Sequence, residues 1–181
     1  ECLKREKREN ISILDVGTGS GAIIIALAGI VNELNVKADL IASDISPKAL
    51  KIARDNVSRI IGNQKFKFVE SDLLSRFHHQ HFDIITANLP YIPTKELDTL
   101  APDIEYEPRL ALDGGYDGLE IYRRFIKELS HVTGPVTVFC EITKDQGVTF
   151  QKIVKRYLKS ATAEIYQDYA KIDRIAIIKI S

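Results

Sequence analysis

One stretch near the start of the chain contains a short apolar run, a glycine-rich loop and a longer apolar run, in that order. The run ISILDV at 11–16 has the length of a buried strand, whereas SGAIIIALAGIVNEL at 20–34 is too long for a strand and predicts a helix. A strand that turns tightly into a helix is the opening unit of an α/β fold built on a parallel sheet. This feature constrains the fold more than any other in the sequence.

The same alternation of short and long apolar segments continues to the end of the chain. The last two short runs are joined by only a brief connection. They are expected to be antiparallel, because a parallel pair needs a crossover of about a dozen residues. The sequence therefore predicts a doubly wound, seven-stranded, mostly parallel α/β sheet with a C-terminal antiparallel strand. The predicted strands are 11–16, 38–43, 65–70, 82–88, 135–142, 161–168 and 174–180, and the predicted helices are 20–34, 47–61, 117–132 and 146–160.

Two of the predicted helices have recognisable starts. Ser46 followed by Pro47 is an N-cap with proline at the first helical position, and Gly62 is expected to end that helix in the left-handed conformation. Asp117 with Glu120 three residues later resembles a capping box, which predicts that the later helix starts at 117.

The composition is that of a soluble globular protein, with 45% hydrophobic and 28% charged residues in a chain of 181. Twenty-five basic and 25 acidic residues give a formal net charge of zero, whereas proteins that bind nucleic acid mainly through their charge are usually basic. The two cysteines, Cys2 and Cys140, do not suggest a disulfide framework. No apolar stretch reaches the ~20 residues of a membrane span, and residues 1–10 are charged, unlike a signal peptide. We therefore expect a cytoplasmic protein.

The glycine-rich loop from Asp15 to Gly21 lies where open α/β sheets bind ligands, outside the carboxyl end of a strand. Glycines let the backbone approach a ligand closely, and the following helix offers free N–H groups. Asp44 ends the second strand, where a carboxylate can accept hydrogen bonds from both hydroxyls of a ribose. These residues predict a cofactor that contains a nucleoside.

Two cofactors fit this pattern. Gly17, Gly19 and Ala22 satisfy the G-x-G-x-x-A pattern of dinucleotide sites, which would indicate a dehydrogenase. Asp15 favours S-adenosylmethionine instead, because a carboxylate there could orient the loop or attract a sulfonium-bearing amino acid, and would repel a pyrophosphate. Asp72, after the third strand, is expected to lie near the adenine.

The sequence Asn88-Leu89-Pro90-Tyr91 follows the fourth predicted strand and should lie beside the glycine loop. A planar NH2 nitrogen has a delocalised lone pair, so two acceptors on its hydrogens would orient it and stabilise the positive charge that develops as it attacks a methyl group. The side-chain oxygen of Asn88 and a backbone carbonyl from Leu89 or Pro90 could supply both acceptors. Tyr91 offers a flat face on which an amide or a base can pack.

Two other segments of the chain contain residues that could take part in chemistry. Residues 89–116 lack periodicity and hold four of the six prolines, and a structureless loop of this length predicts an active-site loop or lid. His78, His79 and His81 precede the fourth strand, but a metal would need a further ligand from elsewhere. We therefore interpret the histidines as a solvated loop and expect no metal.

Several motifs together resemble the release-factor glutamine methyltransferases (the HemK/PrmC family). They are LDVGTGSGAI, SDISPKAL, the Asn-x-Pro-Tyr-Ile-Pro run, EPRLALDGGYDGLEIYR, EI followed by DQG, and DRIAIIKI. The resemblance covers essentially residues 11–181, and the stretch from Glu107 to Arg123 is its most specific part. It implies the Rossmann-like fold of class I S-adenosylmethionine-dependent methyltransferases. It also implies methyl transfer to the side-chain amide of the glutamine in the Gly-Gly-Gln motif of peptide chain release factors.

The resemblance also implies roles for individual residues. The cofactor-binding residues would be Asp15, Gly17, Thr18, Gly19, Ser20, Gly21, Asp44, Asp72, Leu73 and Asn88. The substrate glutamine would be held by Asn88, Leu89, Pro90 and Tyr91, of which Asn88, Pro90 and Tyr91 would be catalytic.

Three features depart from the family pattern. Leu89 stands where the family usually has proline, which keeps a backbone carbonyl but is expected to reduce the rigidity of the loop. Leu73 stands where the family often has an aromatic residue and would pack on the adenine without stacking. The family's small N-terminal helical domain is absent, so we expect residues 1–10 to be a linker or helix from that domain and residues 11–181 to be the methyltransferase domain.

Two other functions remain open at this stage. Asn-Leu-Pro-Tyr is also similar to the motif of ribosomal RNA adenine dimethyltransferases, so the chain could methylate the amino group of adenine in RNA or DNA. It could also be a cofactor-binding module that catalyses nothing. The resemblance implies a release factor as protein substrate, and the net charge of zero argues against nucleic acid as the direct substrate. We also expect no membrane partner and a monomeric protein.

Overall fold

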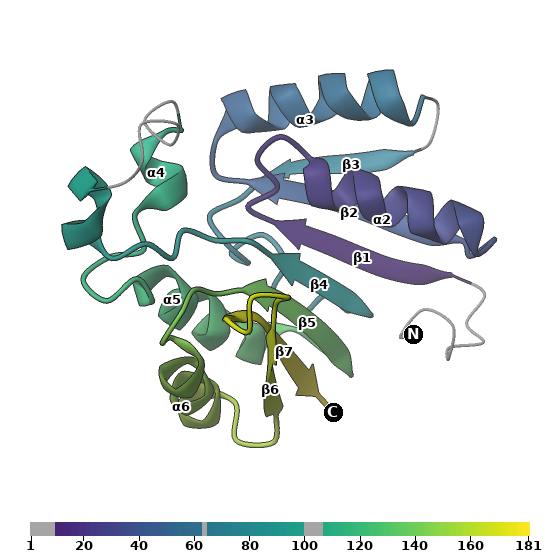
Figure 1. The fold of residues 1–181 in the computed structure, drawn as a ribbon. Coiled ribbons are helices and arrows are strands. Elements are labelled where there is room, and N and C mark those ends of the chain that lie inside the picture. Colours follow the sequence, from purple (N-terminus) through teal and green to yellow (C-terminus); the bar gives the residue numbers. More distant parts are fainter. Residues whose placement is uncertain (1–9, 63–64, 100–106) are drawn as a thin grey trace.

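The computed structural model describes residues 10–62, 65–99 and 107–181 (Figure 1). The expected linker at residues 1–10 falls almost wholly outside this part of the chain, as does Cys2, so the linker stays a prediction. The strands are β1 (Ile11–Val16), β2 (Ala38–Asp44), β3 (Phe66–Glu70), β4 (Ile84–Ala87), β5 (Val136–Glu141), β6 (Thr162–Gln167) and β7 (Asp173–Ile180). The helices are α2 (Ala22–Glu33), α3 (Pro47–Ile60), α4 (Arg109–Leu112), α5 (Glu120–Glu128) and α6 (Gly147–Tyr157), with 3-10 turns η1 (Thr94–Thr99) and η3 (Leu129–His131).

All seven strands belong to one sheet, in the order β3-β2-β1-β4-β5-β7-β6. The first five of these are mutually parallel, whereas β7 runs antiparallel to both β5 and β6. This confirms the predicted seven-stranded, mostly parallel sheet with a C-terminal antiparallel strand. The order reverses direction between β1 and β4, so the loops that leave these two neighbouring strands flank the topological switch point.

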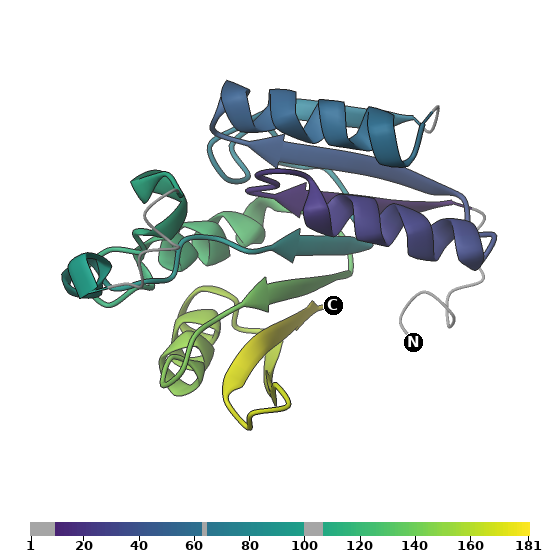
Figure 2. The same ribbon diagram turned by 45° about the horizontal axis from the view of Figure 1, so that its top comes forward.

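Two hydrophobic clusters cover the opposite faces of the sheet. On one face, Ile24 and Ala28 of α2 pack with Ile13 of β1. On the other face, Phe125 of α5 packs in the cluster that holds Phe150 of α6. Figures 1 and 2 show α2 and α5 on opposite sides of the strands. Because each large side chain buried in this way contributes roughly 1.5–3 kcal/mol, the two clusters hold the helices firmly against the sheet.

The start and end of α3 follow the prediction. The Ser46 hydroxyl accepts a hydrogen bond from the Ala49 N–H at 3.3 Å, and Pro47 is the first helical residue. Gly62, just beyond the helix, has φ +78°, the left-handed conformation that glycine adopts without strain. Local chemistry alone sets these boundaries, which is why the sequence predicted them.

The predicted capping box at Asp117 is wrong. Helix α5 begins at Glu120, and Gly118 in between has φ +75°, which is incompatible with helix. The Asp117 carboxylate forms two hydrogen bonds with the Arg123 guanidinium, and the Glu120 carboxylate accepts the Tyr116 N–H at 3.2 Å. The Glu120 side chain therefore stabilises the loop in front of the helix, and Asp117 ties this loop to Arg123 within the helix.

The segment that was expected to be a structureless loop contains regular structure. Within residues 89–116, η1 and α4 form two short helical turns, while residues 100–106 lie outside the described part of the chain. Figure 1 shows η1 and α4 beyond the carboxyl ends of β1, β4 and β5. These two turns therefore lie at the edge of the sheet where the candidate site residues gather.

Within the described residues, none of the helices has the length and apolar character needed to cross a membrane.

Candidate functional site

The glycine loop is a tight backbone turn between β1 and α2. Gly17, Gly19 and Gly21 all have positive φ, at +69°, +55° and +84°. A Cβ atom on Gly21 would lie 3.2 Å from the side chain of Ala53 on α3, so the close packing of α2 and α3 requires glycine there. Thr18 donates its N–H to the Ser43 carbonyl at 2.9 Å, which ties the loop to the end of β2. Ser20 is exposed and its carbonyl accepts from Asn56.

Asp15 is a buried carboxylate that links the glycine loop to β4, the strand that precedes the Asn88–Tyr91 motif. One oxygen accepts the Thr18 hydroxyl at 2.6 Å and the other accepts the Thr86 hydroxyl of β4 at 2.6 Å. Burial raises the pKa of Asp15 from 3.8 to about 6, although both hydroxyl bonds oppose this shift. Of the two roles expected for this carboxylate, the geometry agrees with orienting the loop.

Asp44 is the last residue of β2, as the sequence predicts. Its carboxylate accepts the Gly19 N–H at 2.9 Å and the Ser46 N–H at 2.8 Å. A carboxylate has about four lone-pair sites, so these two bonds leave capacity for further donors. Asp44 therefore fixes the tip of the glycine loop and the start of α3 at once.

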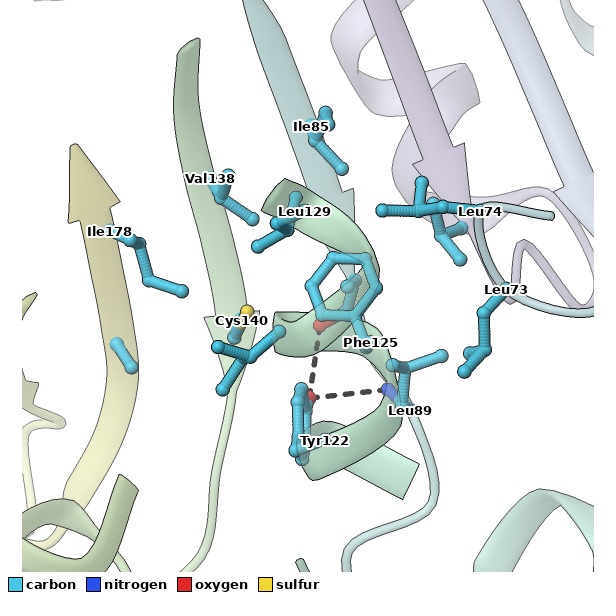
Figure 3. Packing of buried hydrophobic residues seen from close by; sticks show 14 of the residues in the cluster. Leu73, Leu74, Ile85, Leu89, Tyr122, Phe125, Leu129, Val138, Cys140 and Ile178 are labelled. Atoms are coloured by element: carbon cyan, nitrogen blue, oxygen red, sulfur yellow. Dashed lines mark hydrogen bonds between the residues drawn. The ribbon is translucent and has the colours of Figure 1, made fainter. Parts of the chain in front are cut away.

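Asp72 and Leu73 follow the end of β3, beside Asp44. The N–H of Ser71 donates to the Asp44 carbonyl at 3.0 Å, which brings the two strand ends together. The Asp72 carboxylate accepts from the Arg124 guanidinium of α5 at 2.6 Å. Leu73 has φ +49° and is only 7% exposed, packed in the hydrophobic cluster with Leu74 and Leu89 (Figure 3). A leucine in this conformation is strained, and its burial offsets the strain.

The Asn88-Leu89-Pro90-Tyr91 motif leaves β4 directly beside the glycine loop. A Cβ atom placed on Gly17 would lie 3.0 Å from Cδ2 of Leu89 and 3.8 Å from the carbonyl oxygen of Asn88. Asn88 is exposed, whereas Leu89 is buried. The Leu89 N–H donates to the Tyr122 hydroxyl at 3.3 Å, a hydrogen bond that Figure 3 shows as a dashed line.

Tyr91 is held at both its side chain and its backbone. Its hydroxyl donates to Oε1 of Glu141 at 2.9 Å, and its carbonyl accepts from Nε2 of Gln146 at 2.9 Å. Burial, together with the charge and hydrogen bond of Glu141, raises the pKa of Tyr91 to about 12. Pro90 lies between these anchored residues and is partly buried. The whole motif therefore has a defined backbone path.

Gly118 allows the loop before α5 to approach the motif. A Cβ atom at this position would lie 2.2 Å from the Tyr91 carbonyl oxygen and 2.6 Å from Nε2 of Gln146. The sequence singled out the stretch Glu107 to Arg123 but not this contact. Tyr122 and Gln146 stand in two of the motifs that carried the resemblance, but no role at the site was predicted for either, because their partners Leu89 and Tyr91 are distant in sequence.

Figure 1 places these loops at one edge of the sheet, with α4 and η1 beyond them. The predicted residues are therefore brought together at that edge. The histidine group lies away from them, since His81 bonds to Thr133 and His78 packs on His131. In the part of the chain that the structure describes, no group of three or more His, Cys, Asp or Glu residues could hold a metal ion.

Comparisons with known proteins agree with this geometry. Residues 7–168 match a family described as a methyltransferase domain. A release factor glutamine methyltransferase of Moorella thermoacetica is 36% identical over 167 residues, which are 92% of this chain and 58% of that protein. A ribosomal protein uL3 glutamine methyltransferase of Francisella tularensis is 38% identical over 117 residues, which are 65% of this chain and 36% of that protein.

A solved structure shares the fold. The crystal structure of a SAM dependent methyltransferase from Aquifex aeolicus superposes with a TM-score of 0.63 at 16% identity, covering 99% of this chain and 87% of that one. The likeness to this structure at 16% identity shows the fold alone.

The chain spans less than two thirds of the length of the curated relatives it matches, 58% in the case of the Moorella thermoacetica protein.

Proposed function

This chain belongs to the methyltransferase domain family, and from that premise we propose that it transfers a methyl group from S-adenosylmethionine to a glutamine side-chain amide. The proposed acceptor is the glutamine in the Gly-Gly-Gln motif of peptide chain release factors. Support for this acceptor comes from the similarity to the release factor glutamine methyltransferase of Moorella thermoacetica.

The residues at the sheet edge fit S-adenosylmethionine. The positive φ values of Gly17, Gly19 and Gly21 open the backbone for a ligand to approach, and the Asp44 carboxylate keeps free lone pairs for ribose hydroxyls. We assign the glycine loop to the methionine part, Asp44 to the ribose, and Asp72 with Leu73 to the adenine. When bound, this cofactor supplies an electrophilic methyl group on a sulfonium.

The Asn88–Tyr91 motif fits a planar NH2 group. In this assignment the Asn88 side-chain oxygen and the Leu89 carbonyl accept the two amide hydrogens of the substrate glutamine. Two acceptors hold the nitrogen in line and stabilise the positive charge that it gains in the transition state. Tyr91 provides a flat face for the amide, since its ring is anchored at the hydroxyl by Glu141.

The reaction in this site needs no strong general base. A methylated amide nitrogen is acidic and loses its proton readily after transfer. Tyr91, with a pKa of about 12, stays protonated at neutral pH and acts as a hydrogen-bond donor to Glu141 rather than as a base. The chain's contribution is therefore orientation and charge stabilisation.

The observation that carries this proposal is the contact between the two loops. Leu89 packs against Gly17 so closely that a Cβ atom on Gly17 would lie 3.0 Å from the leucine side chain. A methyl donor on the glycine loop and an acceptor on the motif would consequently be neighbours. A dehydrogenase has no need of an amide-binding motif at this position.

The test is methyl transfer from labelled S-adenosylmethionine to a release factor, beside the same factor with its Gly-Gly-Gln changed to Gly-Gly-Ala. We expect label in the first and none in the second. The variant Asn88→Ala should lower the rate at least about 100-fold while the protein still binds S-adenosylhomocysteine, because one of two acceptors is lost. Equal label in both release factors would refute the glutamine assignment.

A second acceptor has support of its own. The similarity to the Francisella tularensis protein favours a glutamine of ribosomal protein uL3 as an alternative substrate of the same site. Parallel assays with uL3 and with an adenine-containing RNA oligonucleotide would separate the possibilities. Transfer to the RNA alone would replace the protein acceptor by a nucleic-acid one.

A further inference from the structure

We propose that Tyr122 is the positioning residue of the acceptor motif, and that its hydroxyl fixes the backbone from which Asn88 and Leu89 reach the acceptor nitrogen. This proposal rests on the proposed function for its catalytic consequence. The structural part of it stands on the contacts of Tyr122 alone.

Tyr122 lies completely inside the protein, with 0% of its surface exposed. Its ring packs edge-to-face on Phe150 of α6, with the ring centroids 5.4 Å apart, and on Phe125 at 6.4 Å. Aromatic neighbours from two helices therefore fix the ring, and the ring fixes the position of its hydroxyl.

The hydroxyl meets three backbone groups at the ends of two adjacent strands. It accepts the Leu89 N–H at 3.3 Å and lies 3.1 Å from the Ala87 carbonyl oxygen and 2.5 Å from that of Glu141. A tyrosine hydroxyl has one proton and two lone pairs, so it can accept from Leu89 while its proton is shared by the two carbonyls. Ala87 is the last residue of β4 and Glu141 the last of β5, so the hydroxyl bridges the strands where the motif begins.

The hydroxyl keeps its proton at every pH at which the protein would be assayed. Burial raises the pKa of Tyr122 well above its ordinary value, because the phenolate would be charged inside an apolar cluster. The bridge is therefore permanent, and it does not switch with pH.

Leu89 makes this bridge particular to this chain. A proline at position 89 would have no N–H and could not donate to Tyr122. The leucine has both the N–H that binds Tyr122 and the side chain that contacts Gly17 of the cofactor loop. Tyr122 thereby holds the residue that joins the two halves of the site.

The experiment compares Tyr122→Phe with Phe82→Leu, a change of another buried aromatic residue. Phe82 packs edge-to-face on Phe77 and precedes β4, whereas the motif follows the end of that strand. Three quantities are measured for each variant: hydrogen exchange of the Leu89 amide, the dissociation constant of S-adenosylhomocysteine, and kcat and KM with the release factor. Thermal unfolding reports whether each variant is folded.

For Tyr122→Phe we expect exchange of the Leu89 amide to accelerate at least about tenfold, and kcat to fall about 10- to 100-fold, because small displacements of a positioned group cost this much. Cofactor affinity should change less than about twofold, since the hydrogen bonds of the Tyr122 hydroxyl go to Leu89, Ala87 and Glu141 and not to the glycine loop. Phe82→Leu should lower the melting temperature but leave kcat within about threefold. The variant Leu89→Pro lacks the N–H that donates to Tyr122. Adding Tyr122→Phe to this variant should therefore lower kcat by a several-fold smaller factor than Tyr122→Phe does in the original chain.

Two results would overturn the proposal: unchanged exchange of the Leu89 amide in a folded Tyr122→Phe protein, or a loss of kcat no greater than that of Phe82→Leu. If neither release factor nor uL3 is methylated by the original chain, the proposed function fails, and the amide exchange by itself still decides whether Tyr122 fixes the motif.

Discussion

The buried carboxylate of Asp15 predicts an unusual dependence of stability on pH. Its pKa is raised from 3.8 to about 6, and burial is the largest cause. Between about pH 4 and pH 6 the folded protein therefore holds a proton that the unfolded chain has released. The free energy of unfolding falls as the pH rises through this window, and the whole cost is present at pH 7.

The size of the effect follows from the two pKa values. The difference between 3.8 and about 6 corresponds to about 3 kcal/mol, since one pKa unit equals about 1.4 kcal/mol. No allowance for solvent screening is needed, because Asp15 is only 1% exposed. This is a large fraction of the roughly 5–15 kcal/mol by which a domain is stable.

The assay is urea unfolding of the original chain and of Asp15→Asn at several values between pH 4 and pH 7.5. The asparagine has nearly the same shape but does not titrate, so the stability difference between the two proteins cancels the other titrating groups. We expect the original chain to lose about 2.5 kcal/mol relative to the variant across this range, because part of the full effect has already developed at pH 4. A difference that stays constant within about 0.5 kcal/mol would refute the reasoning.

A second variant checks the cause of the shift. The Thr86 hydroxyl donates to the Asp15 carboxylate at 2.6 Å and opposes the rise of its pKa. In Thr86→Val the pKa of Asp15 should rise further, so the loss of stability should extend to higher pH. If the window moved to lower pH instead, the hydroxyl would not be stabilising the charged form.

Three further predictions concern single contacts of the site. Gly118→Ala should lower the free energy of unfolding by at least about 2 kcal/mol, because the new Cβ would clash with the Tyr91 carbonyl oxygen. Gly19→Ala has open space around the new Cβ and should lower it by only about 1 kcal/mol, and thermal unfolding compares the two variants. Tyr91→Phe should leave the shape of the pH–rate profile unchanged up to about pH 10, since a group with a pKa of about 12 does not titrate there. If the fall in rate at high pH disappeared in the variant, Tyr91 would titrate in this range. Arg124→Ala should change stability by less than about 1 kcal/mol, because its ion pair with Asp72 is 51% and 45% exposed; chemical denaturation measures this, and a loss above 2 kcal/mol would contradict it.

The features that the sequence predicted well are those set by local chemistry or by periodicity. Strand β1, the glycine loop and α2 form a continuous unit whose pattern is complete within about two dozen residues. The antiparallel end of the sheet followed from the short connection between β6 and β7. Asp44 stands at a strand end, so its place beside the loop follows from the parallel topology alone.

The features that the sequence could not predict depend on contacts between distant residues. Asp117 and Glu120 have the spacing of a capping box, but Arg123 and the backbone of Tyr116 bind their carboxylates instead. Gln146 lies 55 residues from Tyr91 in sequence, and nothing in its neighbourhood marks it as a donor to that carbonyl. A polar side chain becomes recognisable as part of a site only when its buried partner is known.

Leu89 shows how the two kinds of information combine. Topology predicts that Gly17 and Asn88 are neighbours, because β1 and β4 pair in register at Val16 and Ala87, the residues that immediately precede them. Compared with a family pattern that has proline, however, the leucine suggested a less rigid loop. In the structure it is buried, touches Gly17 and donates to Tyr122, so its side chain and its N–H each restrain the loop in a way that a pattern of residue types does not reveal. A departure from a motif therefore has to be judged by the contacts that the new residue makes, and here those contacts join the proposed donor and acceptor sides of the site.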